Sequence, residues 1–412
     1  MGQTAAEKIL GAHAGGRAVR PGELVWARVD RASIDDVQWP IFKEAFAELG
    51  GTIFDREAAI TIADHYLPPS TVDQAETVAE LRAFTLAHGL PHGFFEEGVK
   101  HQVFIEAGLV GPGDLIIATD SHTPTAGAVG AMGVAVGPTE VAAAFVFGEV
   151  WLRVPPTIRI VLTGRLPRMV FTKDVALHLL HEEGTRFGTY RVLEFAGTAV
   201  ERMSLAERLT LCNMGTEMGA KATMLAPGEG ANPTGAAPVL SDPDAAFERE
   251  IHVDVGALEP LVAAPHQPSN ARAVSHFRDV KVDQAFIGSC ANATFEDLAI
   301  AAGFLSGRRV APGVQMIVTP SSVGAYRRAL AEGLIDVFLK AGAVVTNPGC
   351  GSCAGVHCGL LGPRQVRISS QNRNFIGRSG HPSSSIYLAS PAVVAASAIT
   401  GRITDPREVM SA

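Results

Sequence analysis

The chain has 412 residues, of which 47% are hydrophobic and 18% charged, and it contains 43 glycines and 25 prolines. This length exceeds what a single hydrophobic core usually organises, and the apolar fraction excludes a disordered chain, so we expect two or three substructures. The net charge of −8 gives no general attraction to nucleic acid or anionic membranes, and no apolar run approaches the roughly 20 residues that span a bilayer.

The predicted elements alternate between strands and helices along most of the chain. We predict strands at residues 23–29, 59–62, 113–120, 157–162, 284–288, 314–318, 343–346 and 365–369, and helices at 72–88, 172–182, 204–218 and 322–332. This alternation is typical of an α/β fold with doubly wound parallel sheets. Gly- and Pro-rich composition predicts a loop at 227–238 and a linker at 261–270. The expected subdomains are 1–155, 156–282 and 283–412.

Two acid–histidine pairs lie at the ends of predicted strands. Asp64 and His65 follow one strand, and Asp120 and His122 end another. A carboxylate beside an imidazole can raise the pKa of the ring and fix its tautomer, as a general acid requires. One such pair is often only a satisfied surface group, but two pairs at strand ends favour catalysis. His101 by itself indicates only a structural role.

A segment rich in small residues, TPTAGAVGAMGVAVGPTE at residues 123–140, follows the second pair. Small residues let a helix and a neighbouring backbone approach each other closely. Two explanations remain open for this segment, a bound ligand near the backbone or tight packing alone.

The five cysteines are too few for a disulfide framework, and their odd number leaves one unpaired, so we expect a reducing, cytoplasmic environment. Cys350 and Cys353 lie in a Gly-rich turn directly after an apolar strand, and Cys290 also follows an apolar strand. Since the carboxyl ends of parallel strands share one crevice, these three thiols could meet there. Four thiolates, with Cys358 as the fourth, would suit structural zinc, whereas three leave an open position on a metal or cluster.

The final third of the chain is basic. Residues 351–400 contain four arginines and no acidic residue. The four are Arg364, Arg367, Arg373 and Arg378. Such a run is typical either of a solvated face or of a site for an anionic ligand. Arg373 and Arg378, which follow Asn372 in the motif SSQNRNFIGRSG, could bind carboxylates through paired hydrogen bonds, or a phosphate.

These motifs, in this order, resemble the aconitase superfamily of iron–sulfur hydro-lyases. The resemblance covers nearly the whole chain and rests on the segments ADHYLPPS, EGVKHQV, ATDSHTPTAGAVGAMGVAVG, LCNMGTEMGA, DVGALEPLVA, IGSCANATFED, NPGCGSCAG and SSQNRNFIGR. Length and spacing are most similar to the isopropylmalate dehydratase branch. The resemblance implies an aconitase-like α/β fold of three subdomains around a central iron–sulfur cluster, without the swivel domain of full-length aconitases.

The resemblance also implies roles for individual residues. Cys290, Cys350 and Cys353 would ligate three irons of a 4Fe-4S cluster, whose fourth, open iron would bind substrate and water as a Lewis acid. Asp64 with His65 would protonate the departing hydroxyl. The residues implied to hold and polarise the water are His101, Asp120, His122 and Glu217. The residues implied to lie near the cluster or bind substrate are Ser121, Asn213, Asn292, Asn372, Arg373 and Arg378. Cys212 and Cys358 fall outside the ligand motif.

A partner and a reaction follow from the same resemblance. It implies a separate small subunit that carries the swivel domain and the catalytic serine. The expected reaction is the dehydration and rehydration of a 2-hydroxy dicarboxylate, with 3-isopropylmalate in leucine biosynthesis as the leading substrate. Alternative substrates are 2,3-dimethylmalate, citramalate, homocitrate or homoaconitate, and citrate. Alternatives from other classes are an RNA-binding regulator in the apo form, which the net charge of −8 disfavours, and a structural zinc protein.

Two segments depart from the pattern of the isopropylmalate dehydratase branch. After Cys290 that branch usually has Thr-Asn-Gly-Arg, whereas this chain has Ala-Asn-Ala-Thr. The segment DDVQWP places Asp35 where relatives carry His or Gln, and Gln38 where they carry Thr. Both departures bear on the identity of the substrate.

Overall fold

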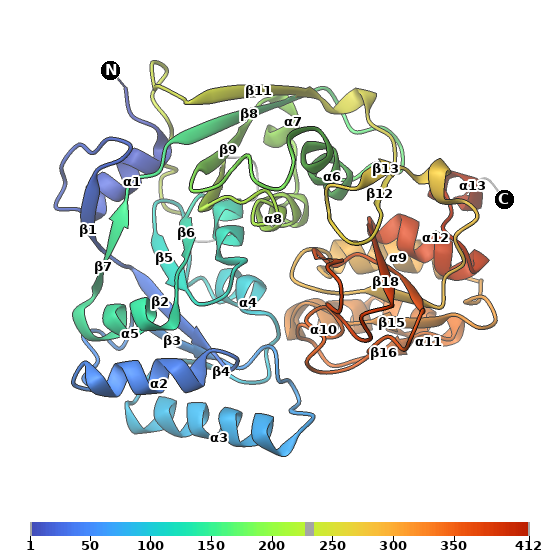
Figure 1. Ribbon diagram of the computed structural model, residues 1–412, viewed down its shortest axis with the longest axis horizontal. Coiled ribbons are helices and arrows are strands. Elements are labelled where there is room, and N and C mark those ends of the chain that lie inside the picture. Colours follow the sequence, from blue (N-terminus) through green and yellow to red (C-terminus); the bar gives the residue numbers. More distant parts are fainter. Residues whose placement is uncertain (1, 227–234, 411–412) are drawn as a thin grey trace. The chain divides into compact units, whose positions relative to one another are not determined.

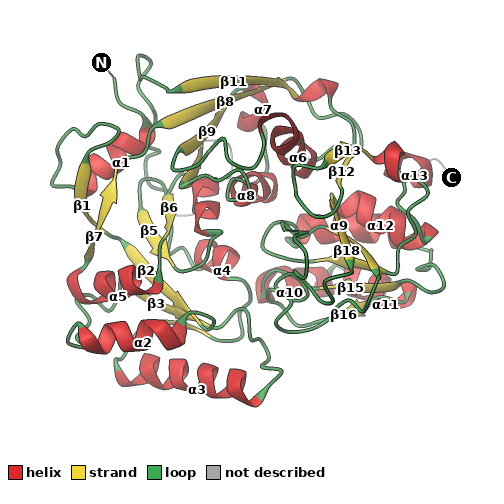
Figure 2. Ribbon diagram, in the orientation of Figure 1, coloured by secondary structure: helices red, strands yellow, loops and turns green. Residues whose placement is uncertain are grey.

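The computed structural model describes residues 2–226 and 235–410 (Figure 1). The chain folds into two compact units, each assembled from three separate segments. The first unit comprises Met1–Phe95, Phe104–Gly164 and Arg186–Asp254, and the second comprises Glu96–Val103, Arg165–Thr185 and Val255–Ala412. Helices and strands alternate within both units, so the α/β class is confirmed (Figure 2).

The first unit is built on two parallel sheets. The larger has the strand order β4-β3-β2-β5-β6, and the smaller has the order β10-β9-β8-β11. The strands are β2 (Arg31–Asp35), β3 (Ala59–Ile62), β4 (His92–Phe94), β5 (Leu115–Ala118), β6 (Met132–Ala135), β8 (Thr157–Thr163), β9 (Val192–Ala196), β10 (Ala222–Leu225) and β11 (Arg249–Asp254). Every neighbouring pair in these sheets is parallel. Strands β3 and β5 are buried along their whole length, which explains why their sequences, AITI and LIIA, do not alternate between apolar and polar residues.

Helices and one antiparallel ribbon complete the first unit. They are α1 (Ala5–His13), α2 (Trp39–Glu48), α3 (Val72–Ala87), η1 (Thr123–Val129), α5 (Pro138–Phe147), α7 (Thr198–Glu201), α8 (Leu205–Met214) and the ribbon of β1 (Leu24–Arg28) with β7 (Glu149–Arg153). Helix α2 packs against α5 through Phe42 and Phe145, whose ring centroids lie 5.0 Å apart. Helix α4 (Lys100–Glu106) begins in the second unit and ends in the first.

The second unit is built on one mixed sheet with the order β13-β12-β18-β17-β14-β15-β16. Its elements are α6 (Thr172–Glu183), η2 (Val255–Ala257), β12 (Leu261–Ala263), β13 (Ala271–Ala273), η3 (Val274–Phe277), β14 (Gln284–Ile287), α9 (Phe295–Leu305), β15 (Gln315–Val318), α10 (Val323–Ala331), α11 (Leu334–Ala341), β16 (Val344–Val345), β17 (Val366–Ser369), β18 (Ser385–Ala389), α12 (Pro391–Thr400) and α13 (Pro406–Met410). Strands β14 to β18 are parallel to one another. Their carboxyl ends therefore lie at one edge of the sheet, where the residues after them can meet.

The structure confirms every predicted strand and helix and corrects some of their lengths. Helix α8 ends at Met214, not at Met218, because residues 215–219 form a turn whose N–H groups bond to nearby carbonyls. Residues 227–234 of the predicted loop at 227–238 lie outside the described residues. No helix among the described residues has both the length and the apolar character that crossing a bilayer requires.

The small residues of the segment 123–140 serve tight packing. A Cβ placed on Gly127 would lie 1.8 Å from the carbonyl oxygen of Thr223, and one on Gly133 would lie 2.1 Å from that of Thr123. Both distances are far inside van der Waals contact, so only glycine fits. The close approach of η1 to β10 and β6 thus explains the composition without a ligand.

Candidate functional site

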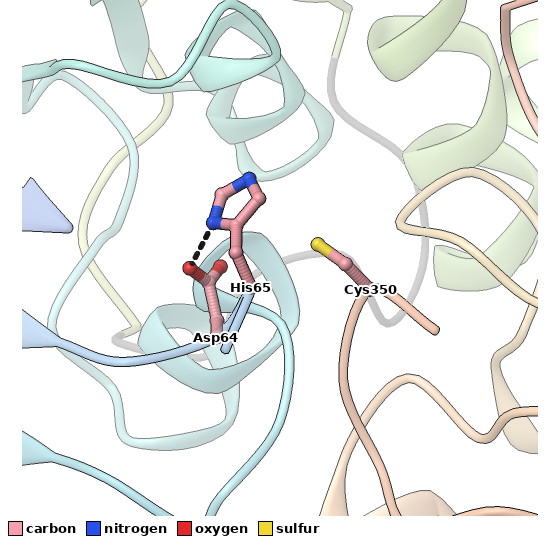
Figure 3. A group of neighbouring side chains, drawn as sticks. All are labelled: Asp64, His65 and Cys350. Atoms are coloured by element: carbon pink, nitrogen blue, oxygen red, sulfur yellow. Dashed lines mark hydrogen bonds and ion pairs between the residues drawn. The ribbon is translucent and has the colours of Figure 1, made fainter. Parts of the chain in front are cut away.

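The first unit places His65 among carboxylates. Asp64 and His65 follow β3, and the Nδ1 atom of His65 lies 2.9 Å from Asp64 Oδ1 in a hydrogen bond (Figure 3). The same nitrogen lies 3.3 Å from Asp36 Oδ1, and the Nε2 atom lies 3.5 Å from Asp120 Oδ2. Carboxylates on both sides of an imidazole favour its protonated form, which suits a proton donor.

Asp36 is a residue of this cluster that the sequence analysis did not name. It follows β2, is fully buried, and accepts hydrogen bonds through Oδ2 from the backbone N–H groups of His65 (3.1 Å) and Tyr66 (2.7 Å). Burial raises the pKa of Asp36, and the His65 ring opposes that shift. The signal in the sequence was the acidic pair directly after an apolar stretch, but only the parallel pairing of β2 with β3 places it beside His65.

Asp35 lies next to this cluster and has hydrogen-bond partners of its own. Its Oδ2 accepts a hydrogen bond of 2.6 Å from Thr119 Oγ1, and its Oδ1 accepts one of 3.0 Å from the backbone N–H of Gln38. Ligand atoms of Asp35, Asp36 and His65 lie within 4.8 Å of one another, a spacing that a metal ion could use. The hydrogen bonds already account for this arrangement, so we assign these carboxylates to the support of His65 and its strand ends.

The ring of His122 lies between two carboxylates and closer to that of Glu217 than to that of Asp120. Its Nε2 lies 3.0 Å from Glu217 Oε1, and both side chains are buried. Asp120 accepts the backbone N–H of His122 at 2.6 Å, and its oxygen is 3.6 Å from the ring. Glu217 reaches the ring because it lies in the turn beyond α8. Asp120 therefore contacts both the backbone and the ring of His122, and Glu217 adds a second carboxylate at the other ring nitrogen.

A cavity of about 480 Å³ opens beside Ser121 within the first unit. Its lining includes Trp151, Tyr190 and Lys221, from β7 and from loops next to β9 and β10. Ser121 is half-buried, and its Oγ lies 3.3 Å from His122 Nδ1. Ser121 therefore lines this cavity next to a candidate catalytic ring.

Two further residues of the first unit have structural surroundings. Asn213, on α8, donates a hydrogen bond of 3.0 Å to Thr125 Oγ1 of η1. Cys212 is completely buried, and burial raises the pKa of its thiol to about 12. A thiol so far from ionising is a poor metal ligand, in agreement with its expected bystander role.

The second unit brings candidate cluster ligands together around Asn372. The Nδ2 of Asn372 donates to Cys290 Sγ at 3.2 Å, and its Oδ1 accepts from Cys353 Sγ at 3.3 Å. Cys350 lies in the same turn as Cys353, whose backbone N–H bonds to the Cys350 carbonyl at 3.2 Å. None of the three is in a disulfide bond, and Cys290 and Cys350 are only partly buried. Thiols that follow β14 and β16, next to the asparagine that follows β17, fit the ligands of an iron–sulfur cluster.

Local backbone geometry presents Cys290 and the arginine loop. Ser289, between β14 and Cys290, has a φ of 81°, a left-handed conformation that turns the chain sharply. Lys173 of α6 is fully buried and donates to the carbonyls of Ser370 (3.0 Å) and Gln371 (2.8 Å). These bonds hold the start of the loop that carries Arg373, which is half-buried.

The arginine run is neither one solvated face nor one ligand site. Arg364 is exposed, Arg373 and Arg378 are half-buried, and Arg367 is fully buried in β17. Only Arg373 and Arg378 therefore remain candidates for binding an anionic substrate. The sequence could not separate them from Arg367, because β17 is buried on both faces and shows no alternation.

His101 and Asn292 also lie in the second unit. His101 is on α4, in a segment held by the antiparallel bridge of Gly98 with Ser322. A Cβ on Gly98, whose φ is 116°, would lie 2.4 Å from a carbonyl oxygen, so the segment needs glycine there. Asn292 donates at 3.0 Å to Asp297 of α9, which supports the turn after Cys290.

Comparison with known proteins agrees with this architecture. The sequence matches the profile of the Aconitase family (aconitate hydratase) over residues 7–232 and 229–401. It is 44% identical to the 3-isopropylmalate dehydratase large subunit of Moorella thermoacetica, with 100% of both chains covered. It is 42% identical to the 3-isopropylmalate dehydratase large subunit of Heliobacterium modesticaldum, with 99% of this chain and 100% of the relative covered. It is 43% identical to the 3-isopropylmalate dehydratase large subunit 1 of Methanopyrus kandleri, with 99% of each chain covered.

A solved structure supports the fold alone. The crystal structure of Thermococcus kodakaraensis aconitase X matches with a TM-score of 0.53 and 17% identity, and the match covers 89% of each chain. The fold is therefore aconitase-like. With the family profile and the full-length relatives, it follows that the chain belongs to the aconitase family.

Proposed function

We propose that this chain is the large subunit of a 3-isopropylmalate dehydratase, a hydro-lyase that interconverts 2- and 3-isopropylmalate in leucine biosynthesis. The observation that carries the proposal is the end-to-end identity of 42–44% with large subunits of that name. Those names also support a separate small subunit as partner. The proposal places the swivel domain and the catalytic serine on that subunit, and the enzyme in the cytoplasm.

The proposed cofactor is a 4Fe-4S cluster held by Cys290, Cys350 and Cys353. This ligand set is supported by the contacts of Cys290 and Cys353 with the Asn372 amide, and by the position of Cys350 in the same turn as Cys353. When bound, the cluster supplies a Lewis acid at the iron that has no cysteine ligand. Cys358, whose thiol lies 4.0 Å from Ser352 Oγ and has its pKa raised by burial, is not part of the set.

Acid–base chemistry is assigned to the first unit. His65 protonates the departing hydroxyl, because its ring lies among the carboxylates of Asp64, Asp36 and Asp120, which favour the protonated form. The pair of His122 with Glu217 orients the water that is lost and re-added, together with Asp120 and with His101 of the second unit.

Substrate binding is assigned to arginine, hydroxyl and amide groups. Arg373 and Arg378 bind carboxylates and stabilise the enolate-like charge that develops when the proton beside a carboxylate is removed. Ser121 contributes a hydroxyl group. The amides proposed to support substrate and cluster are Asn213, Asn292 and Asn372.

The test is the activity of the complex with its small subunit, reconstituted anaerobically with iron and sulfide. Against a panel of 2-hydroxy dicarboxylates, we expect alkene absorbance to appear with 3-isopropylmalate. The panel includes 2,3-dimethylmalate, citramalate, homocitrate and citrate, since the buried Asp35 departs from the branch pattern. A cluster-loaded complex that dehydrates no member of the panel would contradict the hydro-lyase assignment.

The cluster is tested with a matched pair of variants. Cys353→Ser should abolish the broad visible absorbance of the reconstituted protein, whereas Cys358→Ser should keep it. Bound zinc without that absorbance would instead support a structural zinc protein. A salt-dependent change in RNA mobility caused by the apo chain would favour the RNA-binding alternative.

A further inference from the structure

Arg367 is a buried cation in the middle of the second unit's sheet. It lies in β17, directly opposite Gln284 of β14, and none of its surface is exposed. A charged side chain at such a position loses its hydration and is retained only where the protein replaces the lost water contacts. The contacts of Arg367 therefore indicate the role of its positive charge.

All the hydrogen bonds of Arg367 go to neutral acceptors. Nε donates to Gln284 Oε1 at 2.6 Å, and Nη1 donates to the carbonyl of Ser352 at 3.1 Å and to Gln371 Oε1 at 3.2 Å. Nη2 donates to the carbonyl of Gly359. Two of the four acceptors are thus main-chain carbonyls. That of Ser352 lies in the turn between Cys350 and Cys353, and that of Gly359 lies six residues after Cys353, so the guanidinium group fixes this part of the chain to the sheet.

The positive charge itself has no carboxylate partner. Among the described residues, no Asp or Glu oxygen lies within 4.0 Å of the Arg367 nitrogens, and residues 351–400 contain no acidic residue at all. Burial lowers the pKa of Arg367 to about 10, so the group stays charged at neutral pH. A buried unpaired charge costs several kcal/mol, which an apolar residue in β17 would avoid.

Arg367 lies close to the cysteine ligands. Its Nη1 donates to the carbonyl of Ser352, the residue directly before Cys353. The guanidinium carbon lies 5.5 Å from the centroid of the Phe286 ring, and Phe286 packs with Ile317 and Cys353 in one buried cluster. A cluster bound through cysteine thiolates would bring negative charge to this side of the sheet.

We propose that Arg367 is a positioning residue for the iron–sulfur cluster, which fixes the cysteine turn and whose positive charge raises the reduction potential of the cluster. The inference rests on the proposed cofactor. A fixed positive charge in a region of low dielectric stabilises the form of the cluster that holds one more electron. Removing the charge should lower the potential, so that the cluster loses an electron more readily and is more easily damaged by oxygen.

Four variants of the large subunit, each in complex with the small subunit, test the two roles separately. Arg367→Gln removes the charge. Gln284→Glu keeps the guanidinium group but places a carboxylate beside it. Arg367→Lys keeps the charge with only three donors for four acceptors. Arg364→Gln is the control, because it removes an exposed arginine three residues away.

The readouts are the midpoint potential of the reconstituted cluster, from an anaerobic redox titration followed by electron paramagnetic resonance, and the rate of cluster loss to a chelator. We expect lower potentials in Arg367→Gln and Gln284→Glu, and an unchanged potential in Arg364→Gln. Arg367→Lys should keep a potential near that of the wild type but lose its cluster several-fold faster. A purely structural role would change the rate of loss without changing the potential.

Unchanged potentials in Arg367→Gln and Gln284→Glu would overturn the inference while leaving the proposed function intact. If Arg367→Gln does not fold, Gln284→Glu decides alone, because the isosteric change keeps the buried guanidinium group. A wild-type complex that shows no cluster absorbance would overturn the proposed function and this inference with it.

Discussion

The two units hold their functional groups by opposite electrostatic means. In the first unit, carboxylates surround imidazole rings: Asp64 and Asp36 flank His65, and Glu217 pairs with His122. In the second unit, buried cations donate hydrogen bonds to main-chain carbonyls. Lys173 donates to the carbonyls of residues 370 and 371, and Arg367 donates to those of residues 352 and 359.

This difference matches the chemistry that each set of groups can perform. Carboxylates near an imidazole stabilise its proton, so the first unit is suited to proton transfer. Carbonyls gathered around buried cations leave a net positive field, so the second unit is suited to anions such as cysteine thiolates and substrate carboxylates. Each of the following predictions changes one side of this comparison.

The largest effect is expected at the centre of the first unit. His65→Asn should lower kcat by roughly 10²- to 10⁴-fold, because it removes the proposed proton donor. The cluster absorbance should stay at its wild-type level, since the change is confined to acid–base chemistry. His252→Asn, which changes an exposed histidine, is the control. A kcat within twofold of the wild type would remove His65 from the mechanism.

A smaller loss is expected when the partner of a ring is changed. Glu217→Gln should lower kcat by roughly 10- to 100-fold, because the amide no longer favours the same tautomer and orientation of His122. The measurement is steady-state turnover of the reconstituted complex, with the exposed Glu201→Gln as control. Activity equal to that of the control would mean that the His122–Glu217 pair is only structural.

In the second unit, Lys173→Met should affect binding more than turnover. Without the ammonium group, the carbonyls of Ser370 and Gln371 lose their donors, and the loop that carries Arg373 is less well held. We expect KM for the dicarboxylate to rise by about tenfold, and the free energy of unfolding to fall by about 1–3 kcal/mol. Lys340→Met, at an exposed site, is the control. An unchanged KM would mean that Lys173 does not position the loop that carries Arg373 for substrate binding.

The smallest effect concerns a buried carboxyl group in the second unit. Burial raises the pKa of Asp174 from 3.8 to about 7, although Leu261 and Phe171 donate backbone hydrogen bonds to it. Between these pH values the folded protein keeps a proton that the unfolded chain has released, so its free energy of unfolding falls as pH rises from about 4 to about 7.

Asp174→Asn should remove this dependence and flatten the curve of Tm against pH by a few degrees. Calorimetric Tm values between pH 4 and pH 8 provide the measurement, and the exposed Asp336→Asn should leave the wild-type slope unchanged. A wild-type slope in Asp174→Asn would mean that Asp174 is ionised throughout this range.

Much of the fold was predictable because the strands are short apolar runs with polar ends. The pair of Asp64 with His65 could be found because the two residues are neighbours in sequence and follow one such run. The role of Asp36 could not, since β2 was not predicted and its pairing with β3 is a long-range contact. The motif resemblance supplied Glu217, whose contact with His122 joins residues 95 positions apart.

The arginine run marks another limit of sequence reasoning. Composition indicated an excess of positive charge, but it could not tell a buried arginine from an accessible one. In a strand buried on both faces, no periodic pattern separates inward from outward side chains. The division between Arg367 and the two half-buried arginines therefore depended on the hydrogen bonds of the folded chain.

The interleaving of the two units has a consequence for how the protein is made. The chain passes between the units five times, and residues 96–103 and 165–185 belong to a unit whose remaining segment begins at Val255. During synthesis these early segments must wait for the C-terminal third before they can make their contacts. The second unit can thus fold only after its last segment has been synthesised, and the segment that contains His101 makes its contacts within that unit only then. A gene fragment that ends before Val255 would lack the longest segment of the second unit.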